Sequence, residues 1–101
     1  MHLLPLVEYM TTVRAHVFIT GWVQGVFFRQ RTKQEAQSRD VKGWIRNLDD
    51  GRVEAVFEGE ESAVQEMVDF SKEGPSGARV ANVEIAFEEF SGEFKDFRVT
   101  Y

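Results

Sequence analysis

The feature that most constrains the fold of this sequence is the order in which strand-like and helix-like patterns follow one another. Residues 13–20 alternate between apolar and polar side chains, which is typical of a strand with one buried face. Residues 27–39 contain no Pro or Gly and are rich in good helix formers, so they predict a helix. Residues 41–48 and 52–58 are strand-like again, and the Asp-Gly step at 50–51 predicts a tight hairpin between them.

The second half of the chain continues this order with one more helix and two more strands. A helix is expected from Ser62, which with Gln65 resembles a capping box, to the GPSG segment at 74–77. Strands are expected around 83–87 and 97–101. The order βαββαβ plus a short fifth strand predicts an α+β fold of the ferredoxin-like split β-α-β type, with an antiparallel sheet and two helices on one face.

The length of 101 residues limits the chain to one domain, which we assign to residues 13–101, preceded by an N-terminal extension of residues 1–12. The extension has a short apolar run but no basic segment before it, so we do not interpret it as a signal peptide. The chain ends just after the last expected strand, which favours a stand-alone protein.

The composition excludes several classes of function. There is no cysteine, which rules out disulfides, thiolate metal sites and cysteine nucleophiles and fits a reducing compartment, so we expect a cytoplasmic protein. The net charge of −5 argues against nonspecific nucleic-acid binding, and no apolar run is long enough to cross a membrane. We therefore expect neither nucleic acid nor membrane as a partner.

The charges are unevenly distributed along the chain. Seven basic and two acidic residues lie between Val13 and Arg46, whereas 14 acidic and five basic residues lie from Asn47 to Tyr101. This asymmetry arises by chance in many solvated surfaces. It also fits a first half that holds a small anion and a second half that supports it.

The predicted topology brings two distant segments together. In a split β-α-β unit the first two strands run parallel with the third between them, so their carboxyl ends lie at one edge of the sheet. The first strand ends at the loop of residues 21–26, and the second ends near Asn47. We expect the loop and Asn47 to share this edge, where ligands bind in many such sheets.

The loop and the helix after it have features of an anion site. Gly21 and Gly25 allow the backbone to turn with several N–H groups pointing inward, at the positive end of the helix dipole. Arg29 lies in the first turn of that helix, where a cation is unfavourable for the dipole, and its guanidinium suits two phosphate oxygens. Taken alone, these residues are equally compatible with an ordinary turn and a surface arginine.

Three segments resemble one known family. Residues 19–29 (ITGWVQGVFFR) are similar to the first signature of the acylphosphatase family, and residues 43–53 (GWIRNLDDGRV), followed by Gly59, are similar to its second. Residues 74–80 resemble the loop that this family has after its second helix. The resemblance spans about residues 13–101 with compatible spacing.

The resemblance implies hydrolysis of the carboxylic–phosphoric anhydride bond of acyl phosphates to carboxylate and inorganic phosphate. Arg29 and Asn47 would be the catalytic residues, Arg29 holding the phosphoryl oxygens and Asn47 orienting the attacking water. The phosphate cradle would be formed by residues of the loop and the helix start: Trp22, Val23, Gln24, Gly25, Val26, Phe27, Phe28 and Arg29. We expect no metal or other cofactor, inorganic phosphate as product and inhibitor, and a monomer.

The sequence departs from the family pattern at two positions. Phe27 stands where many members have Gly, which narrows the mouth of the expected pocket, and Ile45 stands where a smaller residue is common.

Two other functions are compatible with the predicted fold. An RNA-binding module shares the topology and would use exposed aromatic side chains of the sheet. A carbamoyl-phosphate-hydrolysing domain is the other alternative.

The remaining polar residues have structural interpretations. We expect His16 to be a packed or surface side chain, and Asp49 and Asp50 to form the hairpin turn. Glu58, with its neighbours Glu60 and Glu61, is expected to be a solvated entry to the second helix.

Overall fold

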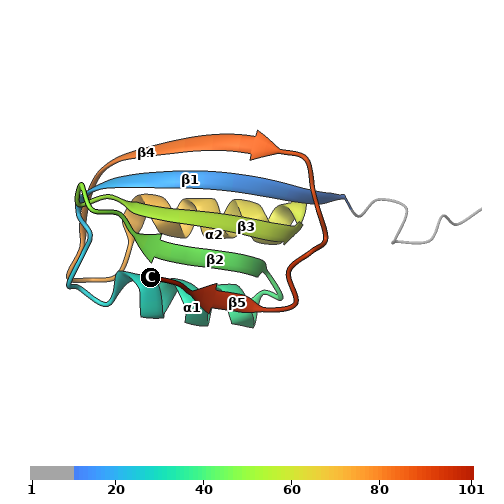
Figure 1. The fold of residues 1–101 in the computed structure, drawn as a ribbon, viewed down its shortest axis with the longest axis horizontal. Coiled ribbons are helices and arrows are strands. Elements are labelled where there is room, and N and C mark those ends of the chain that lie inside the picture. Colours follow the sequence, from blue (N-terminus) through green and yellow to red (C-terminus); the bar gives the residue numbers. More distant parts are fainter. Residues whose placement is uncertain (1–10) are drawn as a thin grey trace, which may run out of the picture.

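The computed structural model describes residues 11–101, so most of the predicted extension lies outside the described residues. The elements follow the predicted order (Figure 1): β1 (Thr12–Trp22), α1 (Phe28–Ser38), β2 (Lys42–Asn47), β3 (Val53–Glu60), α2 (Glu61–Glu73), β4 (Arg79–Glu88) and β5 (Phe97–Val99). β1 begins at Thr12, which pairs with Glu60 of β3. No helix among residues 11–101 is long and apolar enough to cross a membrane.

The strands form one sheet in the order β4-β1-β3-β2-β5. β3 lies between β1 and β2 and is antiparallel to both, which confirms the split β-α-β arrangement. The expectation of a wholly antiparallel sheet was wrong, because β5 runs parallel to β2. The connection after β4 crosses the end of the sheet, so β5 enters the sheet from the same end as β2 (Figure 1).

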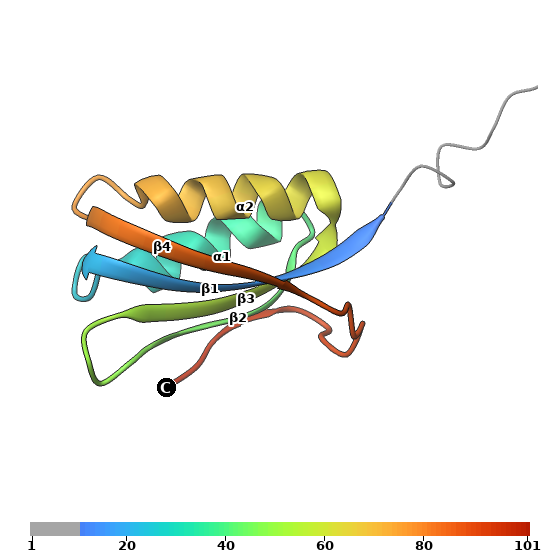
Figure 2. The ribbon, with the colours of Figure 1, turned by 90° about the horizontal axis from the view of Figure 1, so that it is seen from above.

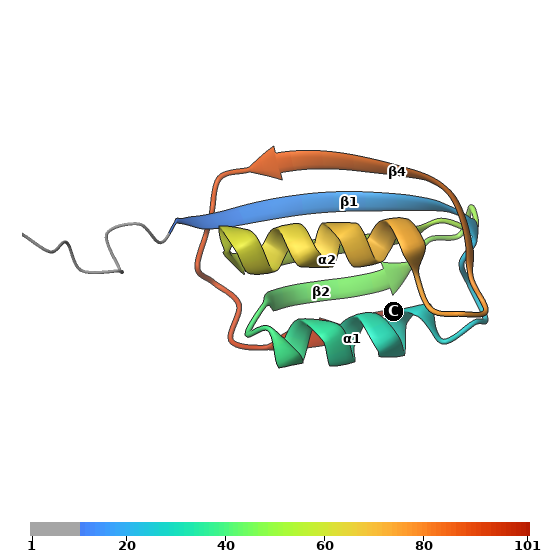
Figure 3. The same cartoon turned by 180° about the vertical axis from the view of Figure 1, so that it is seen from behind.

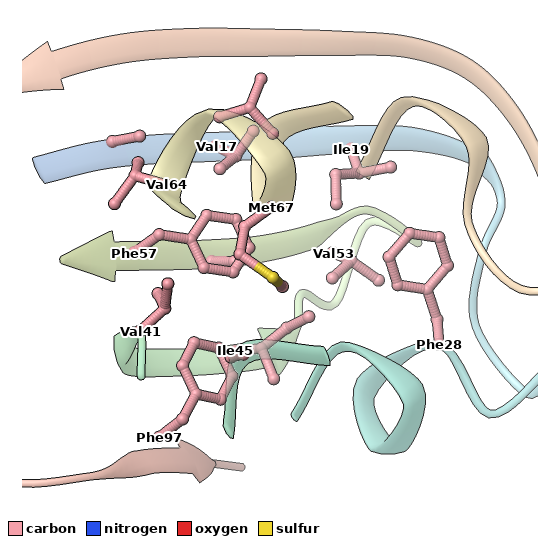
Figure 4. Packing of buried hydrophobic residues seen from close by; sticks show 14 of the residues in the cluster. Val17, Ile19, Phe28, Val41, Ile45, Val53, Phe57, Val64, Met67 and Phe97 are labelled. Carbon is pink, nitrogen blue, oxygen red and sulfur yellow. The ribbon is translucent and has the colours of Figure 1, made fainter. Parts of the chain in front are cut away.

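Both helices lie on one face of the sheet, as predicted (Figures 2 and 3). The core lies between these layers and is built from alternate residues of the strands and one stripe of each helix (Figure 4). Phe57 of β3 and Phe97 of β5 stack with ring centroids 5.7 Å apart. The narrow stripe expected for α1 is confirmed, since Phe28, Thr32 and Ala36 are its buried residues.

The capping box expected at Ser62 and Gln65 was wrong. α2 begins one residue earlier, after Glu60 in an extended conformation, and has no side-chain cap. The Ser62 hydroxyl donates to the carboxylate of Glu60, and the Gln65 amide donates to Asp69. The N–H of Glu61 instead donates to the carbonyl of Thr11 at 2.8 Å, so the chain before β1 provides a partner that the local pattern did not reveal.

The sheet face turned away from the helices, here the open face, is strongly charged. It presents Arg14, His16 and Phe18 of β1, Trp44 and Arg46 of β2, Glu54 and Glu58 of β3, and Glu88 of β4. Both ring nitrogens of His16 contact carboxylates, Nε2 that of Glu54 at 2.6 Å and Nδ1 that of Glu88 at 2.9 Å. His16 is therefore a packed side chain, as expected.

The expectation that Glu58 is a solvated residue was wrong, because its side chain is only 1% exposed. Glu58 accepts hydrogen bonds from the Arg14 guanidinium, the N–H and hydroxyl of Ser91, and the N–H of Gly92. The β4–β5 connection thus covers Glu58 at the end of the open face. Burial raises the pKa of Glu58, but these hydrogen bonds lower it more, so the pKa lies below its ordinary value.

Candidate active site

The ends of β1 and β2 and the start of α1 lie at the same edge of the sheet (Figure 1). A pocket of about 310 Å³ opens there. It is lined by Val23, Gly25, Phe27, Phe28, Arg29, Gln30 and Asn47. The β1–α1 loop and the last residue of β2 therefore share this edge, as the predicted topology requires. The pocket brings Arg29 and Asn47 together although 18 positions separate them in the sequence.

The β1–α1 loop turns through two left-handed backbone positions. Gly25 has a φ of 75°, and Phe27, the residue before α1, has a φ of 62°. A left-handed conformation costs a residue with a Cβ roughly 1–2 kcal/mol. Phe27 is nevertheless 79% exposed, so burial of its ring does not offset this strain.

The side chain of Gln24 fastens the loop to the β2–β3 hairpin. Its amide Nε2 donates to the carbonyl of Leu48 at 2.8 Å and to that of Arg52 at 2.9 Å. The hairpin is closed by the expected turn, in which the Asp50 carboxylate accepts from the N–H of Arg52. Gln24 therefore ties the loop to the segment that directly follows Asn47.

The backbone N–H groups of the loop are available to a ligand. Within the part of the chain that the structure describes, no N–H from Val23 to Gln30 donates a hydrogen bond to another protein group. The first N–H groups of a helix have no intrahelical partner and carry its positive dipole end. An anion in the pocket would satisfy these donors.

Arg29 lies half-buried in the first turn of α1, as predicted. Among residues 11–101, no carboxylate lies within ion-pair distance of its guanidinium. The guanidinium contacts the Tyr101 ring, whose centroid is 5.2 Å from Cζ, in a cation–π contact. Such a contact leaves the charge of the guanidinium in place.

Asn47 provides the second polar side chain of the pocket. Its Oδ1 is buried and has no hydrogen-bond partner among the described residues. A buried acceptor without a donor costs about 1–3 kcal/mol. The atom is therefore suited to a ligand or a water molecule that brings a donor into the pocket.

The other residues predicted for the cradle lie around the pocket rather than in its lining. Trp22 is the last residue of β1 and is paired with Arg79, Gln24 binds the hairpin, and Val26 packs against the core. Sequence reasoning missed Gln30 as a lining residue, although its place beside Arg29 in the first helical turn is a usable signal. It also missed the contact of Tyr101 with Arg29, for which the sequence carries no signal.

Between residues 11 and 101 no group of three or more His, Asp or Glu side chains is arranged to hold a metal ion. The polar groups of the pocket lining are the Arg29 guanidinium, the side-chain amides of Gln30 and Asn47, and backbone N–H groups, which are mostly donors. Such a set suits an oxyanion.

The chain is similar to known proteins both in sequence and in fold. The family model described as acylphosphatase matches residues 15–99. An acylphosphatase of Pyrobaculum aerophilum is 54% identical over 91 residues, which cover 89% of this chain and 96% of that protein. The structure of an acylphosphatase from Coxiella burnetii is similar with a TM-score of 0.85 and 35% identity, over 92% of this chain and 96% of the other. The crystal structure of acylphosphatase from Bacillus subtilis is similar with a TM-score of 0.84 and 34% identity, over 88% and 99%.

Proposed function

This chain belongs to the acylphosphatase family, and we propose that its pocket binds the phosphoryl group of an acyl phosphate beside a water molecule oriented by Asn47. In this proposal Arg29 and the backbone N–H groups of the β1–α1 loop hold the phosphoryl oxygens. An enzyme of this class hydrolyses the carboxylic–phosphoric anhydride bond to a carboxylate and inorganic phosphate.

The binding step follows from the charges in the pocket. The forked guanidinium of Arg29 donates to two phosphoryl oxygens, and the N–H groups at the start of α1 donate to the others. Because no described carboxylate neutralises Arg29, its charge is available to the dianionic phosphoryl group. Charge spreads over the equatorial oxygens in the transition state, so these donors stabilise the transition state as well.

The hydrolytic step needs a water molecule in line with the leaving carboxylate. We assign its orientation to Asn47, whose Oδ1 accepts a hydrogen bond from one O–H of the water, so that a lone pair of the water oxygen points at phosphorus. The new O–P bond forms as the bond from phosphorus to the carboxylate oxygen breaks. An amide does not deprotonate water at neutral pH, so the other water proton passes to a phosphoryl oxygen of the substrate.

The leaving group explains why so few residues suffice. A carboxylate is a weak base, so it departs with its electron pair and needs no general acid. The phosphoryl transfer then depends on positioning and charge stabilisation, which Arg29, Asn47 and the loop provide.

All of these groups come from one chain, so a monomer suffices for the reaction. The cytoplasmic location stays a prediction.

The observation that carries this proposal is that one pocket is lined both by Asn47, whose buried Oδ1 has no described hydrogen-bond partner, and by Arg29, which has no described ion-pair partner. The RNA-binding alternative is not favoured, because the aromatic rings of the open face are engaged by neighbours. Phe18 lies under the Arg52 guanidinium and Trp44 lies under that of Arg46, which also donates a hydrogen bond to the Glu54 carboxylate.

The proposal is tested by hydrolysis of acetyl phosphate in the presence of a metal chelator. We expect full activity with chelator, competitive inhibition by inorganic phosphate, and much slower hydrolysis of phosphate monoesters, whose alkoxide leaving groups need acid assistance. Loss of activity with chelator and its recovery with a divalent ion would overturn the mechanism. Equal rates on acyl phosphates and monoesters would contradict the argument that the site works without a general acid because its leaving group is a carboxylate.

A further inference from the structure

A second depression, of about 490 Å³, adjoins the pocket that Arg29 and Asn47 line, which is called the phosphate pocket from here on. Its lining shares Gly25 and Phe27 with the phosphate pocket and is completed by Val26, Arg31, Pro75, Ser76 and Gly77. The depression therefore lies between the start of α1 and the α2–β4 loop, two segments that meet at the same end of the molecule (Figure 3). A group attached to a phosphoryl oxygen in the first pocket would reach the second by passing Phe27.

The walls of this depression are already fixed in shape. On one side Arg31 is held in α1, where its N–H donates to the carbonyl of Phe27 at 3.0 Å. On the other side the N–H of Ala78 donates to the carbonyl of Pro75 at 2.9 Å, which closes the α2–β4 loop into a turn. A preformed site binds a ligand without the cost of ordering its walls.

Phe27 itself has no structural reason to be aromatic. Its backbone adopts a left-handed conformation in which glycine would be unstrained, and its ring is 79% exposed. The ring is therefore held at the boundary of the two depressions although neither backbone preference nor burial favours it. Its flat face is available to a planar group.

Arg31 adds a second recognition element to the same depression. Its guanidinium is half exposed, and its only described ion pair is a long contact of 3.8 Å with Glu35, one turn further along α1. A guanidinium at this place interacts favourably with the face of an aromatic ring. Phe27 and Arg31 thus both select for a planar π system.

On the basis of the proposed function, we infer that the second depression is the acyl-group subsite and that it selects aromatic acyl phosphates over small aliphatic ones. Phe27 is the specificity-determining residue, since it contacts both the phosphate pocket and the acyl subsite. Stacking of two aromatic groups is worth enough to change relative rates about threefold to tenfold.

The test compares kcat/KM for benzoyl phosphate and acetyl phosphate in the full chain and in variants. We expect Phe27→Gly to lower the benzoyl-to-acetyl ratio about threefold to tenfold relative to the unmodified protein, mainly through a higher KM for benzoyl phosphate. Phe27→Leu, which keeps an apolar side chain but no flat face, should lower the ratio nearly as much. Normalising to the unmodified protein removes the difference in intrinsic reactivity between the two substrates.

Phe87→Ala is the matched control, because Phe87 is an exposed aromatic residue of β4 that lines neither depression. Its ratio should stay unchanged. An unchanged ratio in Phe27→Gly, an equal loss on both substrates, or an equal effect of Phe87→Ala would overturn the acyl subsite. If the unmodified protein hydrolysed neither substrate, the proposed function itself would fail, which is a distinct outcome.

Discussion

The open face of the sheet and the pocket at its edge treat charged groups in opposite ways. On the open face Arg14 contacts the carboxylates of Glu58 at 3.2 Å and Glu88 at 3.0 Å, and His16 lies between two glutamates. In the pocket Arg29 has no described carboxylate partner, and Asn47 Oδ1 has no described donor.

The difference separates groups that stabilise the fold from groups that serve a ligand. A polar group that is partly or fully buried destabilises the protein unless it is paired. On the open face the charged groups are paired with one another, so they contribute to the stability of the fold. The pocket leaves the requirement to be met by a bound anion and a water molecule, so its polar groups act on catalysis.

The largest expected effect is that of Arg29→Ala, which removes the only side-chain cation of the pocket lining. We expect kcat/KM to fall about a thousandfold and inhibition by phosphate to be lost, with little change in the free energy of unfolding. Arg29→Lys should restore little, because a point charge does not replace the planar fork. Steady-state kinetics and urea unfolding measure both quantities.

The matched control is Arg79→Ala. Arg79 also lacks a described carboxylate partner, but it is exposed on β4 and lies outside the pocket lining. Its kcat/KM should stay within about twofold of the unmodified protein. Near-normal phosphate inhibition in Arg29→Ala would show that the anion binds elsewhere.

On the open face we expect the opposite result from Glu58→Ala. The change leaves the half-buried Arg14 guanidinium and the N–H groups of Ser91 and Gly92 without their acceptor, so the free energy of unfolding should fall by about 3 kcal/mol. Activity measured below the unfolding transition should persist. The exposed neighbour Glu60→Ala should cost no more than about 0.5 kcal/mol, and equal losses in both variants would refute the assignment.

Asn47→Ala should lower kcat about a hundredfold and leave inhibition by phosphate nearly unchanged, since Arg29 and the loop still bind the anion. Stability should not fall, because the change removes a buried acceptor that has no described donor. Asp49→Ala, in the exposed turn two residues later, should keep normal kcat. A rise in KM without a fall in kcat would mean that Asn47 binds substrate and does not orient water.

The smallest expected effect is the pH dependence of stability from His16. Burial lowers the pKa of His16, but the hydrogen bonds that its ring donates to the carboxylates of Glu54 and Glu88 raise it more, so it lies above its ordinary value of 6.5 in the folded protein. The stabilisation is therefore complete below pH 6.5 and is lost as the pH rises through the raised pKa. Urea unfolding at several pH values measures this loss, and His16→Gln should remove it.

The acid side of the same profile has the opposite sign. Burial raises the pKa of Glu54, but the hydrogen bonds from His16 and Arg46 lower it more, to below its ordinary value of 4.5. Its contribution is present above pH 4.5 and is lost as the pH falls through the lowered pKa. A stability profile that rose above pH 7 in the unmodified protein would contradict the ion pairs described for His16.

The sequence predicted the shared edge of the loop and Asn47 because this proximity follows from topology alone. Hydrophobic alternation gives the strands, helix propensity gives the crossover, and the handedness of the connection then fixes which strand ends meet. The resemblance of the short motifs around Arg29 and Asn47 to the acylphosphatase signatures then indicated which residues at this edge belong to the site. No side-chain contact was needed for this prediction.

The errors concern residues whose surroundings come from distant parts of the chain. Glu58 was expected to be solvated because its neighbours in sequence are acidic, yet it is buried by Ser91 and Gly92, more than 30 positions away. The direction of β5 depends on the path of the β4–β5 connection, which has no periodic pattern. The side-chain contacts of Gln24 were not foreseen, because its two acceptors are carbonyls that any residue would provide.

The contact between Arg29 and Tyr101 has a consequence for folding kinetics. The two residues are 72 positions apart, and Tyr101 lies two residues beyond β5, which pairs with β2. Pairings across such long stretches of chain close large loops and form slowly. We therefore expect this contact to form late, so in a refolding experiment it should appear after α1, α2 and the three central strands.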